Sequence, residues 1–179
     1  MPTLFTHPAV PIAMAFGLGR GVVSKRLLIA GITISVLPDL DVVGFRLGIA
    51  YGAEFGHRGF SHSLLFAFSV ALAGALLYRW LDSTFHRALW FLFAAMASHS
   101  LLDAFTNGGL GVALLWPWSE HRFFAPVKVI EVSPIAPSRF LSQRGMEVLW
   151  SEITWVWLPC IGIAATFAAS RFISGKLES

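Results

Sequence analysis

Two polar side chains stand at the end of one of the most apolar parts of the sequence. His99 and Asp103 lie four residues apart, within and just after the apolar run 88–102. In a helix this spacing places both side chains on one face, about 5–6 Å apart, close enough to share a metal ion. An ionisable group inside a bilayer costs about 2.5–3.5 kcal/mol on insertion scales, so the pair needs an explanation. The alternative to a metal site is a His–Asp hydrogen bond inside a helix bundle.

Two further clusters supply metal-ligand types. His57 and His62 stand five residues apart in the motif HRGFSHS, across a turn that contains glycine, so they can converge on one site. Asp39 and Asp41 close the motif LPDLD, and carboxylates are hard oxygen ligands that bridge or orient metal ions. The alternatives are a solvated loop for the histidines and an ordinary turn for the aspartates.

The HRGFSHS motif also contains groups that suit an anion. Ser61 or Ser63 is a natural N-cap for a helix that begins near residue 64. The amino end of such a helix carries positive partial charge and free N–H groups. Because Arg58 lies beside it, this place is suited to a phosphate or another anion.

Five apolar runs must position these groups. They cover residues 8–18, 27–37, 64–78, 88–102 and 153–170. The whole chain is 56% hydrophobic and 13% charged, with a mean hydropathy of +0.70, whereas a soluble domain has about 45–50% apolar and about 25% charged residues. This composition argues against a soluble enzyme, a disordered chain and a nucleic-acid-binding module, and it favours a membrane protein. The net charge of +3 is too small to indicate a polyanionic partner, and no nucleic-acid-binding patch is evident.

The lengths of the runs predict the fold. A helix needs about 20 residues, and at least roughly 17, to cross the apolar core of a bilayer. We predict an all-α integral membrane bundle of about four membrane helices in a single domain, residues 1–179, with the core motifs in 7–119 and a C-terminal membrane helix at about 153–170. The first two runs are shorter, so they form either a tight hairpin of short spans or helices packed partly inside the protein.

Antiparallel packing of these runs brings the polar clusters together. A hairpin of 64–78 and 88–102 places HRGFSHS beside His99 and Asp103, and a hairpin of the first two runs places His7 beside Asp39 and Asp41. We therefore expect all the ligand clusters at helix ends on one membrane face. The opposite face receives seven basic residues: Arg20, Lys25, Arg26, Arg79, Arg87, Arg171 and Lys176. By the positive-inside rule this basic face is cytoplasmic, and the site is on the non-cytoplasmic face of a multi-pass inner-membrane protein.

Imidazole and carboxylate ligands without thiolates favour zinc, with manganese or iron as alternatives, and the number of ions stays open. A divalent cation beside an anion pocket suits metal-assisted hydrolysis of a phosphoester, with water as the attacking group and Arg58 stabilising charge. Ser61 is a less favoured nucleophile. The alternatives are a non-enzymatic metal-ion binding or transport protein, and a structural or regulatory membrane protein.

In their order, His7, LPDLD, HRGFSHS, HSLLD and LLWPWS resemble the YdjM-like family over about the first 125 residues. Its members are described as LexA-regulated, inner-membrane-associated, predicted metal-dependent hydrolases, distantly similar to zinc-dependent phospholipase C and single-strand nucleases. The resemblance implies that Arg58 and Ser61 face the substrate, and the one-sided convergence of histidines and aspartates favours a phosphoester that is a lipid or lies near the membrane. The resemblance also implies that seven residues are ligands or close neighbours of the metal: His7, Asp39, Asp41, His57, His62, His99 and Asp103.

Other polar and aromatic residues receive weaker interpretations. The WPWS segment, residues 116–119, either matches the family's aromatic-proline turn or forms an interfacial aromatic belt, and His121 after it is expected in a solvated loop. His86 falls on the predicted cytoplasmic side and should have no part in the chemistry. Cys160 is expected to be a small packing residue, and no role is assigned to Glu152.

Overall fold

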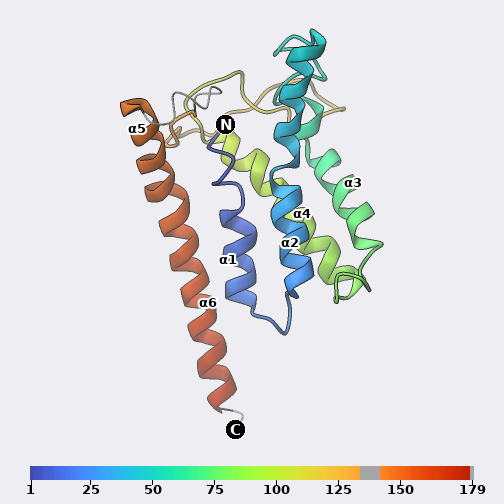
Figure 1. Ribbon diagram of the computed structural model, residues 1–179, viewed down its shortest axis with the longest axis vertical. Helices are drawn as coiled ribbons and strands as arrows, with labels where there is room; N and C mark the ends of the chain where they lie inside the picture. Colours follow the sequence, from blue (N-terminus) through green and yellow to red (C-terminus); the bar gives the residue numbers. More distant parts are fainter. Residues whose placement is uncertain (134–141, 178–179) are drawn as a thin grey trace.

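The computed structural model describes residues 1–133 and 142–177, with side chains to residue 174. In this part of the chain every regular element is a helix, which confirms the all-α class (Figure 1). The elements are α1 (Ala9–Leu18), α2 (Lys25–Ser35), η1 (Leu37–Leu47), η2 (Phe60–His62), α3 (Leu64–Ala75), α4 (Phe85–Ala104), α5 (Gln143–Glu152), η4 (Ile153–Trp157) and α6 (Leu158–Leu177). Irregular chain follows α4 as far as residue 133, and the rest of the predicted loop, 134–141, lies outside the described residues.

Hydroxyl side chains cap the starts of four helices, and Ser142 does so for α5 by accepting a hydrogen bond from the Gly145 N–H. Ser24 caps α2 and Thr84 caps α4, each by accepting a hydrogen bond from a backbone N–H of the first turn. At the start of α3 the cap is Ser63, whose Oγ accepts from the Phe66 N–H at 3.0 Å. Of the two serines that the sequence offered, Ser63 therefore takes the capping position.

Helix α4 is the centre of the bundle. It packs against both α2 and α3, and α1 packs against α6 on the outer side (Figure 1). Small residues of α3, including Ala71 and Ala75, are fully buried beside Leu92 of α4 in the main core. The predicted antiparallel hairpin of the third and fourth apolar runs is thus present, and it fixes where the two ends of α4 lie.

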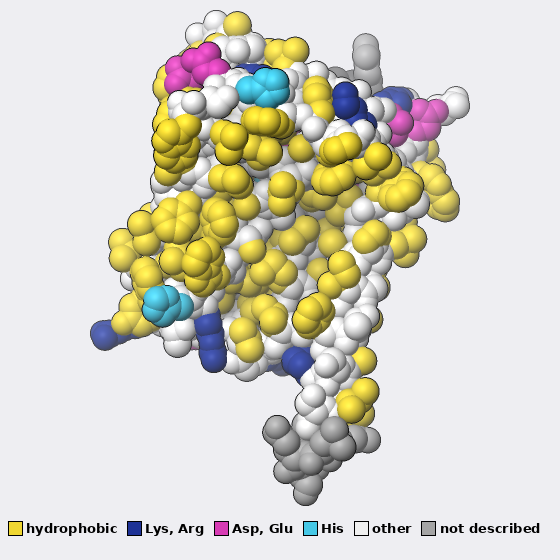
Figure 2. Space-filling view, turned by 180° about the vertical axis from the view of Figure 1, so that it is seen from behind, with side chains coloured by type: hydrophobic (Ala, Val, Ile, Leu, Met, Phe, Trp, Pro, Cys, Tyr) yellow, Lys and Arg dark blue, Asp and Glu magenta, His cyan; other side chains and the backbone are white. Residues whose placement is uncertain are grey.

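The two ends of the bundle differ in their charged residues. The turn 19–24, the connector 76–84 and the last turns of α6 lie at one end, which we call the basic end (Figure 1). Six of the seven basic residues predicted at this end lie in or beside these segments, and the seventh, Lys176, has no described side chain. Apolar side chains cover the surface between the two ends, and charged ones gather at its edges (Figure 2).

The prediction of about four membrane helices is only partly supported. By length and composition, two described segments could cross a membrane, Lys25–Leu47 and Gln143–Ser174. Helices α1 and α3, with 10 and 12 residues, reach only about 15 Å and 18 Å at 1.5 Å per residue. Helix α4 has 20 residues, but it is largely buried and carries polar residues near both ends. The polar site and the short helices therefore reduce the number of clear spans.

The C-terminal span is longer than the predicted 153–170. Helices α5, η4 and α6 follow one another without a break, so the apolar segment begins at Gln143 and extends to Ser174. Its large side chains are mostly exposed, for example Trp155, Ile163 and Phe167 at 55–60%. A long helix with exposed apolar residues on its outer surface requires an apolar surrounding, which a bilayer provides.

Candidate metal centre

Five predicted ligands meet inside the bundle, opposite the basic end. His7 lies just before α1, Asp39 is in the first turn of η1, His62 ends η2, and His99 and Asp103 are in the last turns of α4. All five are buried, and four of them are 0% exposed. Four separate segments of the chain thus supply one cluster, which is the convergence that the helical hairpins predicted.

The distances within this cluster match those around a small cation. The Nε2 atoms of His62 and His99 are 3.1 Å apart, and a carboxylate oxygen of Asp39 lies 3.8 Å and 3.5 Å from them. Asp103 places an oxygen 3.4 Å from Nε2 of His62. Zinc–ligand bonds of about 2.0–2.2 Å in a tetrahedron put neighbouring ligand atoms about 3.3–3.6 Å apart. Asp39, His62, His99 and Asp103 therefore form a group that could hold a metal ion.

Hydrogen bonds orient the two central imidazoles. Nδ1 of His99 lies 2.7 Å from the Ser35 carbonyl oxygen, which only accepts, so this nitrogen carries the hydrogen. Nδ1 of His62 lies 3.2 Å from a carboxylate oxygen of Asp41. When these rings are neutral, each Nε2 keeps a lone pair directed into the cluster, which is the tautomer that metal-binding histidines use.

Asp41 acts as a hydrogen-bond acceptor beside the cluster. Its carboxylate accepts from Nδ1 of His57 at 2.6 Å, from the Ser61 hydroxyl at 2.7 Å and from the Arg58 backbone N–H at 3.2 Å. With His57 and His62 it forms a second group that could hold an ion. However, these contacts already use both of its oxygens. This arrangement favours a role for Asp41 in orienting the two histidines.

Arg58 is fully buried against Asp103. Its Nε lies 3.0 Å from a carboxylate oxygen of Asp103, while its two terminal nitrogens donate to the Gly108 carbonyl and the Thr106 hydroxyl. The guanidinium lies against Gly109, whose φ is +85° and where a β-carbon would come 2.8 Å from Nη1. The Gly-rich stretch after α4 is therefore needed to seat this arginine.

The cluster has an excess of negative charge and unsatisfied polar atoms. Three carboxylates, those of Asp39, Asp41 and Asp103, face two cationic groups, the Arg58 guanidinium and the Met1 amino group 4.0 Å from Asp103, so negative charge is in excess when the histidines are neutral. Both oxygens of Asp39 and of Asp103 and both ring nitrogens of His7 have no hydrogen-bond partner among the described residues. Unpaired buried charge is costly unless a cation neutralises it. The residues present therefore fit a divalent cation.

Two histidines of the cluster have strongly shifted pKa values when no cation is bound. Burial disfavours the imidazolium of His7 and, with the adjacent ring of His99, lowers the pKa of His7 to about 3. Burial also opposes the charged form of His62, but the adjacent carboxylates of Asp103 and Asp41 outweigh it and raise the pKa of His62 to about 9. In the metal-free protein a proton on His62 thus takes part of the place of a cation.

The remaining predicted residues lie in different surroundings. Ser61 is buried with its hydroxyl on Asp41, and Arg58 is buried on Asp103. Their proposed contact with a substrate therefore stays a prediction. His121 is exposed in the loop beyond the site, and His86 is exposed at the other end of the molecule, near the start of α4.

The aromatic-proline segment lies near the site without entering the cluster. Trp116 packs its ring against Phe60 of η2, and its Nε1 donates to Glu54. Trp118 is 77% exposed. One tryptophan thus supports the loop over the site while the other is free to contact a membrane interface.

Sequence reasoning missed two supporting residues. Glu152, at the end of α5, is fully buried and accepts hydrogen bonds from the hydroxyls of Thr3 and Thr6 at 2.7 Å each. It thereby attaches the segment before His7 to the C-terminal helices. Arg122 donates to the His57 carbonyl at 2.9 Å and to the Ala53 carbonyl at 3.0 Å. These two hydrogen bonds hold the loop that leads into the HRGFSHS motif. A carboxylate so close to a long apolar run was the only sequence signal for Glu152.

Comparisons with known proteins agree with this description. The family model described as YdjM inner membrane protein matches residues 1–177. The inner membrane protein YbcI of Escherichia coli (strain K12) is 52% identical over 160 residues, which cover 89% of this chain and 92% of that protein. No solved structure matches the chain. The chain is therefore a membrane protein that belongs to the YdjM family.

Proposed function

We propose that this protein is a membrane-bound metal-dependent hydrolase of a phosphoester substrate, lipid or membrane-proximal. The observation that carries the proposal is the convergence of two Nε2 lone pairs and two unsatisfied carboxylates within 4.8 Å of one another. Asp39, His62, His99 and Asp103 would hold the ion, with zinc favoured by the donor set, and His7 stands next to them. Such an ion supplies the Lewis acidity that activates water and a phosphoryl oxygen.

The chain's own residues divide the remaining tasks. Asp41 keeps His62 in the tautomer that leaves Nε2 free, and the Ser35 carbonyl does the same for His99. Arg58 neutralises part of the charge of Asp103 and holds its carboxylate in place. His57 is buried, with its Nδ1 on Asp41 and its ring beside Tyr51, so it would hold the Asp41 carboxylate in place.

Metal content tests the site directly. The protein is purified without chelator, and its metal is measured by elemental analysis. We expect about one ion per chain in the wild type and in His86→Ala and His121→Ala, which replace exposed histidines outside the cluster. His99→Ala and His62→Ala should retain less than about a tenth of that metal, since a lost ligand weakens a structured site severely. Full metal retention in both cluster variants would remove the proposed centre.

Activity separates catalysis from metal binding alone. Bis(p-nitrophenyl) phosphate and a short-chain phospholipid serve as probes, with the metal-loaded wild type and Asp39→Asn compared. A hydrolase should lose at least about a hundredfold in rate in the variant, because metal-derived stabilisation of charge contributes several kcal/mol. Equal, background-level rates in both proteins would reject the hydrolase while leaving the metal site untouched.

A non-enzymatic role for the metal is the second candidate. The observation that favours it is the complete burial of His62, His99 and Asp103, which leaves a substrate no direct route to the ion in this arrangement. A catalytic ion must be reached by the ester that is hydrolysed, whereas a structural or transported ion does not have to contact a substrate. Metal that resists exchange, or metal flux into vesicles containing the reconstituted protein, would support this function over hydrolysis.

We further propose a multi-pass arrangement in the inner membrane with the metal centre on the non-cytoplasmic side. The short turn 19–26 and the connector 76–87 carry five of the thirteen basic residues, and basic residues are typical of cytoplasmic loops. Cysteine labelling tests this in a Cys160→Ala background. Trp118→Cys and Trp80→Cys place single thiols at tryptophans 77% and 62% exposed, one at each end. Labelling of both from the same side would contradict the arrangement.

A further inference from the structure

An apolar groove runs along α1 towards the basic end. It lies between α1, α2 and the last turns of α6, and it encloses about 620 Å³. Ile12, Phe16, Leu28 and Ala168 form its apolar wall. Two of its three walls belong to Lys25–Leu47 and Gln143–Ser174, the segments suited to cross a membrane. The groove is therefore placed where membrane lipids would surround the protein.

Positive charge gathers at one end of this groove. The lining cations are Arg20, Lys25 and Arg171. None of the three forms an ion pair within the described part of the chain, and the described lining residues include no carboxylate. Lys25 is also the first residue of α2, whose amino end adds positive partial charge. An apolar channel that ends in unpaired cations complements an amphiphile with a negative head.

Arg171 is held in position by the turn after α1. One of its terminal nitrogens donates to the Phe16 carbonyl at 3.0 Å. The guanidinium lies over Gly19, where a β-carbon would come 1.8 Å from Nη1. Because Gly19 has no side chain, the arginine of α6 can lie across the end of α1. Its position is therefore defined, and its remaining N–H groups are available to a ligand.

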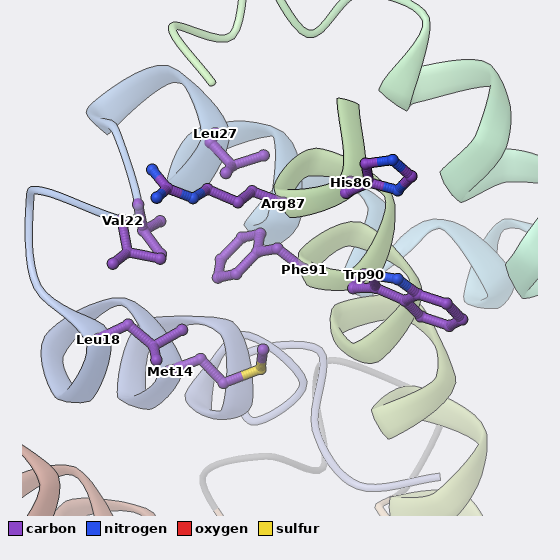
Figure 3. Close-up of a pocket in the computed structure, with 9 residues that line it drawn as sticks. Met14, Leu18, Val22, Leu27, His86, Arg87, Trp90 and Phe91 are labelled. Carbon is purple, nitrogen blue, oxygen red and sulfur yellow. The ribbon is translucent and has the colours of Figure 1, made fainter. Parts of the chain in front are cut away.

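A second cavity at the same end has fewer cations on its walls. It lies between α1, α2 and α4, encloses about 340 Å³, and has the side chains of Met14, Leu18 and Phe91 on its walls (Figure 3). Its one arginine, Arg87, donates to the Gly21 carbonyl. A single, partly engaged cation gives this cavity little selectivity for an anionic head.

We propose that the groove between α1, α2 and α6 binds one anionic phospholipid of the surrounding membrane. Its phosphate lies among Arg20, Lys25 and Arg171, and an acyl chain follows the apolar wall past Phe16 and Leu28. Basic pockets between membrane helices are suited to such head groups. The binding is independent of the metal centre, which lies at the opposite end of the molecule.

Native mass spectrometry of the full-length protein tests the proposal. Protein reconstituted in equimolar phosphatidylglycerol and phosphatidylethanolamine is released from the bilayer, and the retained lipids are identified. We expect one phosphatidylglycerol per chain, retained at least about tenfold over phosphatidylethanolamine, because each basic residue near an anionic head contributes about fivefold in affinity. The triple variant Arg20→Gln, Lys25→Gln, Arg171→Gln should lose this preference.

Matched variants separate the groove from general surface charge. The triple variant Arg26→Gln, Arg79→Gln, Arg87→Gln removes the same charge from the same end and should keep the preference. Ala168→Phe fills the groove without changing charge and should abolish retention, whereas Ala169→Phe, on the exposed side of α6, should not. Equal losses in the two triple variants, or unchanged retention in Ala168→Phe, would overturn the proposal. Circular dichroism and gel filtration verify that each variant is folded.

Discussion

The two ends of this bundle differ in whether their charged side chains are buried and paired or exposed. At the metal-site end, Asp39, Asp103 and Arg58 are buried and contact one another or the histidines. At the basic end, Arg20, Lys25 and Arg171 are exposed and have no acidic partner among the described residues. Buried charges must be compensated, because desolvation costs several kcal/mol per ion, whereas exposed charges keep their hydration. The first end therefore fixes its charges by contacts within the chain, whereas the second leaves its cations available to molecules outside the chain.

The largest difference between the ends should appear when one carboxylate is removed from the interior. Asp103→Ala leaves the guanidinium of Arg58 buried without its acidic partner, and breaking such a pair costs about 3–5 kcal/mol. Thermal unfolding in detergent micelles, followed by circular dichroism, measures the loss. The double variant Asp103→Leu with Arg58→Met should recover part of the stability. A loss below about 1 kcal/mol in Asp103→Ala would show that the interior tolerates the unpaired arginine.

The next largest effect is expected in how the free energy of unfolding of the metal-free protein depends on pH. Because the folded protein raises the pKa of His62 from 6.5 to about 9, this contribution to stability is complete below about pH 6.5 and disappears as the pH rises through 9. The contribution is on the order of 3 kcal/mol. His7, with its pKa lowered to about 3, stays neutral throughout this range.

Chelator-treated protein unfolded in urea at several pH values measures this trend. His62→Gln is the control and should have a flatter profile between pH 6.5 and 9. Metal affinity should change in the opposite direction and increase over the same range, because a proton competes for Nε2 of His62. A metal-free protein that becomes more stable as the pH rises from 6.5 to 9 would contradict the assignment.

A smaller effect belongs to the turn at the basic end. Gly19 has φ +78° and ψ 167°, a conformation that other residues adopt only with strain, so Gly19→Ala should cost about 1–3 kcal/mol. Gly21→Ala is the matched control, since no atom would meet its β-carbon within 4 Å, and it should change stability by less than about 0.5 kcal/mol. Urea unfolding of both variants measures the difference. Similar values would show that the turn adjusts freely.

The smallest effect is expected for an exposed ion pair. Arg26 and Asp82 lie 3.3 Å apart at the basic end, with side chains 52% and 60% exposed. Asp82→Asn should change the free energy of unfolding by less than about 1 kcal/mol, and added salt should reduce even that. Asp103→Asn, measured alongside, should cost several times more. Equal effects of the two substitutions would remove the contrast between the ends.

Two helices of equal length show what the sequence could not distinguish. Helices α4 and α6 each have 20 residues and similar apolar content. Both were predicted as membrane helices from that composition, yet α4 is the buried centre of the bundle and α6 exposes most of its apolar side chains. Apolar content measures the need to avoid water, and protein interior and lipid satisfy it equally. Only the packing of the helices therefore decides whether each one is surrounded by protein or by lipid.

The sequence by itself determined the helical class, the membrane association of the family and the gathering of His7, Asp39, His62, His99 and Asp103 at one end. These follow from composition and from alternating helix direction, which local spacing encodes. Only the tertiary structure decided that Asp41 orients histidines, that Arg58 is held by Asp103, and that Glu152 supports the N-terminal segment. Such roles depend on distances between residues far apart in the chain, and these distances exist only after the helices have packed.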